Sequence, residues 1–186
     1  MPRHFPWEGG GVVNVLVLGG TVFVGRHMVA AALARGHRVT IFHRGRHGED
    51  AHPDVEHIHG DRTVDVHLLT GRHWDAVLDT CGFDGPTVAA SAALLADSVA
   101  HYGFVSSVSA YRDWPAARID ETSVLKEPGD TEDDYGAGKV AAEHAVEAAI
   151  PGRVLISRPG LIVGPHENIG RLPHWLRRLA RGGEVL

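Results

Sequence analysis

The run from Val12 to Leu18, followed directly by Gly19, constrains the fold of this chain more than any other feature. The run is almost wholly β-branched or aliphatic, which is typical of a parallel strand buried on both faces. The glycines after it allow a tight turn. The segment from Arg26 to Arg35 then has a helical composition and stops at Gly36. The start of the chain therefore predicts a strand, a turn and a helix.

The rest of the chain repeats this alternation, which predicts a parallel sheet with right-handed crossovers. Residues 1–11 are expected to be a flexible leader and residues 12–186 one domain. The polar, acidic segment 112–134 is expected to be a long loop. Further strands are predicted at 39–42, 55–59, 76–80, 101–106 and 153–157. Helices are predicted at 86–100, 135–149 and 175–181. The predicted helix 86–100 would place Val88, Ala92, Leu95 and Val99 on one face.

Composition narrows the class of protein. The 186 residues carry a net charge of −5 and no long basic run, so nucleic acid is not the expected partner. Cys81 is the sole cysteine, so no disulfide can form within the chain and a reducing cytoplasm is the simplest setting. No apolar run is long enough for a bilayer, and the first residues do not resemble a signal peptide.

Fourteen histidines raise the question of a metal site. His57 and His59 would share one face of a strand, with Asp61 close behind. No cysteine cluster and no HExxH motif accompanies them. We therefore expect hydrogen-bonded or solvated histidines and no functional metal site.

The glycine turn predicts a dinucleotide-binding site. Its sequence runs from Gly19 through Thr21, Val22, Phe23 and Val24 to Gly25 and lies between the first strand and the first helix. Backbone N–H groups at such a turn can approach a pyrophosphate, whose charge the helix N-terminus favours. A turn that serves only close packing is the alternative.

The end of the second strand indicates which dinucleotide is preferred. NAD-binding sites place a carboxylate there, whereas this chain has Arg44 and Arg46. Either guanidinium can pair with the 2′-phosphate of NADP, so NADP is expected in preference to NAD. Ordinary solvated charges are the alternative. Asp61 is expected near the adenine, and the end of the fourth strand, with Cys81 and Gly82, near the cofactor.

Tyr135 and Lys139 are four residues apart in a predicted helix, so they share a face about one turn from each other. A phenol with an ordinary pKa near 10 is a poor base at neutral pH. An adjacent ammonium favours the phenolate, which suits acid–base chemistry. The alternative is a half-buried tyrosine beside a solvated lysine.

Taken in order, several motifs resemble the short-chain dehydrogenase/reductase superfamily, and more narrowly its extended, atypical NAD(P)-dependent epimerase/dehydratase branch. The resemblance extends from Val12 over nearly the whole chain. It rests on Leu18-Gly19-Gly20-Thr21-Val22-Phe23-Val24-Gly25, Gly60-Asp61-Arg62, Phe104-Val105-Ser106-Ser107-Val108-Ser109-Ala110-Tyr111, Tyr135-x-x-x-Lys139 and Arg158-Pro159-Gly160-Leu161-Ile162-Val163-Gly164-Pro165.

The resemblance implies a Rossmann-type, doubly wound α/β/α sheet and a role for particular residues. Ser107 matches the catalytic hydroxyl that binds the substrate oxygen, with Ser106 and Ser109 as rivals. Tyr135 matches the catalytic acid/base, and Lys139 the residue that binds the nicotinamide ribose. Arg62 belongs to the cofactor side, and Pro159 and Gly160 match the loop beside the nicotinamide.

Two departures from the pattern stand out. Val22 occupies the position of the middle glycine of GxxGxxG, as in the atypical subgroup that includes chloroplast stem-loop RNA-binding proteins. A side chain there is expected to alter how closely the backbone approaches a pyrophosphate. Extended members also continue well past the sixth strand, so the C-terminal substrate lobe is expected to be largely absent and the chain to be truncated.

The resemblance implies an NAD(P)-dependent oxidoreductase, epimerase or dehydratase that acts on a carbonyl or secondary alcohol, with a nucleotide sugar as one candidate substrate. Two alternatives stay open: a non-catalytic NADP-sensing module, and an RNA-binding protein of the stem-loop type. The two lysines and the acidic balance weigh against the second alternative. Related proteins often dimerise through two helices, for which 86–100 and 135–149 are the candidates.

Overall fold

The computed structural model describes residues 11–48, 51–115, 118–127 and 135–184. Its centre is a six-stranded, wholly parallel sheet in the order β3-β2-β1-β4-β5-β6. The elements are β1 (Asn14–Leu18), α1 (Phe23–Ala34), β2 (Arg38–His43), β3 (Glu56–His59), β4 (Trp74–Asp79), α2 (Gly85–Leu95), β5 (Val99–Val105), α3 (Tyr135–Ala149), β6 (Val154–Ser157) and α4 (Arg171–Ala180).

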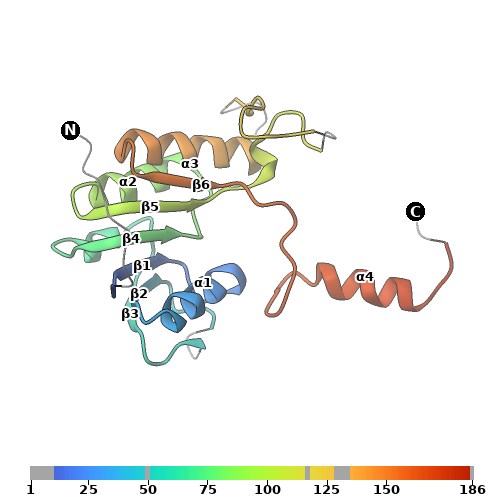
Figure 1. Ribbon diagram of the computed structural model, residues 1–186, viewed down its shortest axis with the longest axis horizontal. Coiled ribbons are helices and arrows are strands. Elements are labelled where there is room, and N and C mark those ends of the chain that lie inside the picture. Colours follow the sequence, from blue (N-terminus) through green and yellow to red (C-terminus); the bar gives the residue numbers. More distant parts are fainter. Residues whose placement is uncertain (1–10, 49–50, 116–117, 128–134, 185–186) are drawn as a thin grey trace.

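The order of the strands confirms the predicted Rossmann-type architecture. The chain moves outward from β1 to β3, returns to the other side of β1 at β4, and moves outward again to β6. The two halves therefore diverge between β1 and β4, and such a switch point opens a crevice at the carboxyl ends of the strands. In Figure 1, α1 lies over one half of the sheet, and α2 and α3 lie together beside the other half.

Alternation along β1 explains why both faces of the sheet need helices. Leu16 and Leu18 pack into a cluster with residues of α2 and α3, whereas Val15 and Val17 pack with Val29 of α1. All four of these β1 side chains are buried. The run that predicted a strand covered on both sides is therefore the central strand of the sheet.

The predicted helix 86–100 is wrong at its end. The α2 helix stops at Leu95, and Val99 and Ala100 already belong to β5. The backbone N–H of Ser98 bonds the carbonyl of Leu95, which turns the chain back toward the sheet. Val99 is buried, as are the core positions of α2. Its position four residues after Leu95 therefore fits a continued helix as well as a buried strand, and the structure has the strand.

The other boundaries differ by one to four residues. The predicted helix at 135–149 matches α3, whereas α1 begins at Phe23 and α4 at Arg171, each earlier than predicted. In Figure 1, α4 lies apart from the sheet, at the end of the segment that follows β6, and none of its residues is buried. Residues 1–10 and 128–134 lie outside the described residues, so the leader and part of the predicted loop remain predictions.

Within the described parts of the chain, no helix combines the length and the apolar character that crossing a membrane requires.

Candidate functional site

A pocket of about 870 Å³ opens at the carboxyl ends of the strands, beside the switch point. It is within the usual size of a site for a cofactor or small ligand. All but one of the residues predicted to form the site line it. These are Gly19, Thr21, Val22, Phe23, Val24, Gly25, Arg44, Asp61, Arg62, Cys81, Ser107, Tyr135, Lys139, Pro159 and Gly160. Gly82 is not among the lining residues, but its carbonyl contacts Lys139.

The glycine turn has the backbone shape that only small residues allow. Gly19 and Gly20 have φ angles of 100° and 81°. A Cβ on Gly19 would lie 2.5 Å from the Thr80 hydroxyl oxygen, and one on Gly25 would lie 2.7 Å from the backbone nitrogen of Gly20. The turn therefore brings its backbone against the first turn of α1 without side chains between them, which suits a pyrophosphate at this helix N-terminus.

Val22 sits in the turn without backbone strain. Its φ and ψ of −122° and 144° are ordinary extended values. The next residue, Phe23, has a φ of 34°, a region that side-chain-bearing residues rarely adopt. Besides the two glycines, the unusual backbone of this loop is thus carried by Phe23, one residue after the position where the family pattern has its middle glycine.

The two arginines predicted to select NADP are exposed at the rim of the pocket. Arg44 and Arg46 directly follow β2, and both are close enough to Asp61 to favour its ionised form. Hydrogen bonds from the backbone and hydroxyl of Thr63 are the larger cause, and together they lower the pKa of Asp61. This end of the pocket therefore offers two cationic groups and one carboxylate to a ligand.

Lys139 is buried at the centre of the pocket wall. Its side chain is 2% exposed, and Nζ donates to the carbonyls of Gly82 at 2.6 Å and Val105 at 2.8 Å. Burial lowers the pKa of the ammonium, while the charge of Asp79 acts in the opposite direction. An ammonium has three donors, so these two bonds leave one for a ligand.

Tyr135 lies above this lysine at the start of α3. The tyrosine is 50% exposed, and Lys139 Nζ is 5.8 Å from the centre of its ring. The rings of Phe83 and Phe104 each lie 5.0 Å from the same nitrogen. The tyrosine is thus exposed, and the lysine is enclosed rather than solvated as the alternative interpretation expects.

The three candidate hydroxyls lie in the turn formed by residues 106–109 after β5, here called the serine turn, and they differ in their hydrogen bonds. Ser107 Oγ accepts a hydrogen bond from the backbone N–H of Ser109 at 3.1 Å, which leaves the hydroxyl hydrogen available to donate. Ser106 is buried, and its Oγ has no partner among the described residues. All three serines line the pocket. Ser107 remains the predicted catalytic serine.

The loop after β6 is tied to the serine turn. The backbone N–H of Val108 donates to the carbonyl of Pro159 at 3.0 Å. The guanidinium of Arg158 donates to the carboxylate of Glu143, at 2.6 Å for the shortest bond, and to the Tyr111 hydroxyl at 3.3 Å. Pro159 and Gly160 are thereby held at the pocket beside Ser107.

A buried polar network beneath the pocket was not foreseen from the sequence. The guanidinium of Arg62 donates to both carboxylate oxygens of Asp79, at 2.7 and 2.6 Å, and to Ser91 at 2.6 Å. The hydroxyl of Tyr102 donates to Asp79 at 2.7 Å. Burial opposes the charge of Arg62, but the carboxylate outweighs it and raises the pKa of the guanidinium. Arg62 lines the pocket, yet its contacts are with this network, so cofactor contact remains a prediction.

Cys81 borders the same network, and its protonation gives a testable consequence. Burial, assisted by Asp79, raises the pKa of the thiol from 9.0 to about 11. Only the thiolate reacts with alkylating reagents, so at about pH 8 we expect alkylation in the native state to be about 100-fold slower than in the denatured chain. Mass spectrometry after timed iodoacetamide treatment, with and without urea, measures both rates. Equal rates would contradict the shift.

The raised pKa of Cys81 also makes the stability of the fold depend on pH. A group whose pKa is higher in the folded state stabilises that state below its unfolded pKa, and the contribution is lost as the pH rises through the folded pKa. The contribution of Cys81 is therefore fully present below pH 9.0 and disappears as the pH rises through about 11.

The sequence of this chain matches a known protein family over most of its length. Two overlapping segments, residues 15–102 and 83–186, match the NAD dependent epimerase/dehydratase family. A stretch of 65 residues is 38% identical to the bifunctional pinoresinol-lariciresinol reductase of Forsythia intermedia, covering 35% of this chain and 20% of that one.

Solved structures share the fold. WbmG of Bordetella bronchiseptica, in complex with NAD, superposes with a TM-score of 0.76 at 20% identity over 97% of this chain and 63% of WbmG. UDP-N-acetylglucosamine 4-epimerase of Bacillus cereus gives a TM-score of 0.69 at 21% identity over 93% of this chain and 64% of the epimerase. The chain thus spans less than two thirds of the length of these structures. By its sequence, the chain belongs to the NAD dependent epimerase/dehydratase family.

Proposed function

We propose that this chain binds NADP in preference to NAD and carries the catalytic residues of an oxidoreductase, epimerase or dehydratase acting on a carbonyl or secondary alcohol. The observation that carries the proposal is the pairing of Lys139 and Tyr135. A buried ammonium lies beneath a half-exposed phenol, in the same pocket as the glycine turn. This arrangement supplies acid–base chemistry next to a dinucleotide site.

The glycine turn fits a dinucleotide because its backbone lines the pocket, and Gly19 and Gly25 let that backbone pack against Thr80 and the start of α1 with no Cβ between them. Such a cofactor supplies a hydride acceptor or donor when bound. Its pyrophosphate would lie at the turn, and a ribose hydroxyl would accept the remaining donor of Lys139. The carbon chemistry would take place between Tyr135 and Ser107.

Each protein group then has one task. The Tyr135 hydroxyl takes a proton from the substrate alcohol, or returns one to a carbonyl. Ser107 donates its hydroxyl hydrogen to the same substrate oxygen and so stabilises charge that develops there. Lys139, held by Gly82 and Val105, supplies a fixed positive charge near the phenol.

A nucleotide sugar is the substrate class that we favour. The support is similarity of fold to UDP-N-acetylglucosamine 4-epimerase, together with the matched family. An epimerase would oxidise and then reduce the same carbon, whereas a reductase would release its product. The residues of the pocket do not distinguish these reactions. A homodimer through α2 and α3 also remains a prediction.

Cofactor selection can be tested with one arginine. Replacing Arg44 with serine should weaken NADP⁺ binding at least about ten-fold, or about 1.4 kcal/mol, and leave NAD⁺ binding unchanged, because only NADP carries the 2′-phosphate. Calorimetric titration of both dinucleotides measures the difference. Arg35→Ser, an exposed arginine at the end of α1, is the matched control.

The outcomes separate three interpretations. The same loss in Arg46→Ser and not in Arg44→Ser would make Arg46 the selector. Equal affinity of the unaltered chain for NADP⁺ and NAD⁺ would contradict the proposed preference, but not the dinucleotide site. Binding of neither dinucleotide would contradict the site itself.

The two alternative functions make different predictions. A non-catalytic sensor would bind NADP and turn over no carbonyl in a broad panel. An RNA-binding protein would show a salt-dependent gel shift, since phosphate contacts are screened by salt. Arg171, Arg177 and Arg178 of α4 would be its basic groups. No contact among the described residues favours either alternative.

A further inference from the structure

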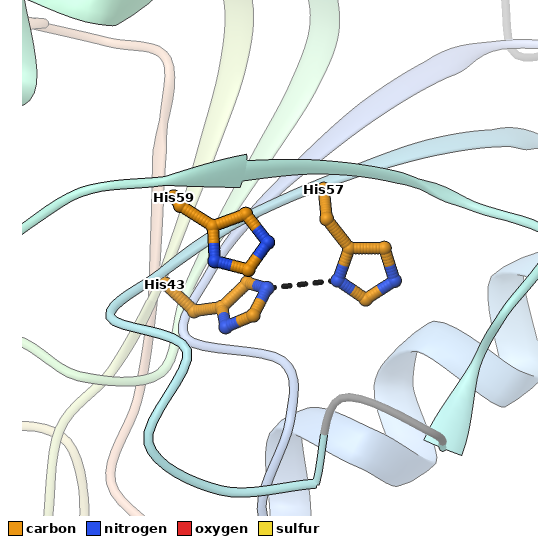
Figure 2. Close-up of side chains that lie close together, drawn as sticks. All are labelled: His43, His57 and His59. Carbon is orange, nitrogen blue, oxygen red and sulfur yellow. Dashed lines mark hydrogen bonds between the residues drawn. The ribbon is translucent and has the colours of Figure 1, made fainter.

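Three histidines lie close together at the carboxyl end of β2 and along β3. His43 is the last residue of β2, and His57 and His59 are alternate residues of β3. In the parallel register His43 is paired with His59, and Ile41 with His57, so the three imidazoles share one face of the sheet. One nitrogen from each ring lies within 4.8 Å of the others. Figure 2 shows the rings of His43 and His57 facing each other with His59 beside them.

The sequence alone indicates only two of these three histidines as neighbours. His57 and His59 were recognised as neighbours on one strand face, and no metal site was expected from them. His43 is fourteen residues earlier than His57 and joins them only through the pairing of β2 with β3. A third imidazole changes the chemistry, because three protein ligands and one open position are a common zinc coordination set.

Hydrogen bonds determine where the imidazole hydrogens are. The backbone N–H of Gly45 donates to His43 Nδ1 at 3.1 Å, so the hydrogen of a neutral His43 is on Nε2. His43 Nε2 lies 2.8 Å from His57 Nδ1 and donates to it. The hydrogen of His57 is then on Nε2, which donates to the carbonyl of His52 at 3.0 Å. His57 Nδ1 therefore points its lone pair toward His43.

His57 is already arranged as a metal ligand. Histidines that bind metals usually donate their second N–H to a carbonyl or carboxylate, which fixes the ring and its tautomer. The bond from His57 Nε2 to His52 has this role. The His52 ring in turn contacts the carbonyl of Arg26 in α1 at 3.1 Å. The segment that orients His57 is thus anchored to a helix.

The gap between His43 and His57 requires only a small adjustment, whereas the nitrogen of His59 lies within 4.8 Å of the other two and must close to about 3.3 Å by movement of an exposed side chain. Zinc–nitrogen bonds of about 2.0–2.1 Å in a tetrahedron place two ligand nitrogens about 3.3 Å apart. The gap of 2.8 Å between His43 Nε2 and His57 Nδ1 must therefore widen by about half an ångström as the shared hydrogen leaves. His59 is exposed and lies at the edge strand of the sheet, so an ion can enter from solvent.

Two features oppose tight binding. Metal ligation through His43 Nε2 moves its hydrogen to Nδ1, where it would face the N–H of Gly45, so the loop after β2 must shift. Arg44 and Arg46 in that loop carry positive charge next to the cluster. We therefore expect micromolar rather than nanomolar affinity.

We propose that His43, His57 and His59 bind one divalent transition-metal ion of the zinc class, at a site beside the dinucleotide pocket. Imidazoles suit Zn²⁺, Cu²⁺ and Ni²⁺, whereas Mg²⁺ and Ca²⁺ require oxygen ligands. His43 also lines the pocket, so the metal would lie next to the loop that carries Arg44 and Arg46. The proposal does not depend on the enzymatic function proposed above.

Titration of the untagged 186-residue chain with Zn²⁺ tests the site, with a chromophoric chelator as competitor. We expect one ion per chain at micromolar concentration and no competition from excess Mg²⁺. His59→Ala should weaken binding at least about ten-fold, and because His59 is exposed this variant should keep the melting temperature of the parent. His57→Gln is the second variant and should weaken binding similarly.

His73→Ala is the matched control, since His73 is an exposed histidine outside the cluster. It should bind Zn²⁺ as the parent does. The proposal is overturned if the parent binds no Zn²⁺ at micromolar concentration, or if His59→Ala and His57→Gln bind it as well as His73→Ala does.

Discussion

Replacing Tyr135 with phenylalanine is expected to lower turnover by about 10²–10⁴-fold on any carbonyl or alcohol that the parent chain converts, because the variant lacks the group that moves the proton. The change removes one oxygen from a half-exposed side chain at the start of α3 and leaves the ring above Lys139. Cofactor affinity should therefore stay within about two-fold of the parent. NADPH oxidation over a carbonyl panel measures the first quantity and calorimetry the second.

Tyr111→Phe is the control for this experiment. Its hydroxyl contacts Arg158, which Glu143 also holds, and Tyr111 does not line the pocket, so the variant loses a phenol oxygen that takes no part in the proposed chemistry. Turnover should survive in Tyr111→Phe. If Tyr135→Phe converts substrate at the parent rate, Tyr135 is not the acid/base. A parent chain that binds NADP but converts no member of the panel would favour the sensing module instead.

The architecture could be predicted because its signals are local. A strand buried on both faces needs apolar residues throughout, and the glycine turn needs small residues at Gly19 and Gly25, so both appear as uninterrupted patterns. The α3 helix was predicted with its observed bounds. The end of α2 was not, because Val99 fits a helical spacing and a buried strand equally well.

The details of the site depend on contacts between distant residues, which no local pattern records. Arg62 follows a motif and was assigned to the cofactor, but Asp79, seventeen residues later, holds its guanidinium. The sequence showed that Lys139 shares a helix face with Tyr135, yet not that two backbone carbonyls enclose it. The His43 ring likewise joins His57 only through strand pairing. Residue types were therefore predictable, and their partners were not.

Asp79→Ala is expected to destabilise the fold by about 3–5 kcal/mol, the usual cost of leaving one member of a buried ion pair without its partner. Asp79 is fully buried and accepts bonds from Arg62 and Tyr102. For a chain of this length the melting temperature should fall by roughly 6–20 °C. Urea denaturation followed by circular dichroism measures the free energy of unfolding.

An exposed ion pair that includes one residue of the sheet separates the effect of burial on stability from the effect of charge. Glu56 of β3 pairs with Arg72, and their side chains are 51% and 37% exposed. Glu56→Ala removes the same kind of interaction in water and should cost less than about 1 kcal/mol.

The double variant Arg62→Met/Asp79→Leu should recover much of the stability lost in Asp79→Ala, because no charge is then buried alone. Equal losses in Asp79→Ala and Glu56→Ala would show that the network beneath the pocket contributes no more than a surface pair. A larger loss in Asp79→Ala than in Glu56→Ala would show that burial, and not charge alone, makes the pair beneath the pocket matter for folding, because only a buried carboxylate leaves its partner without water as a replacement.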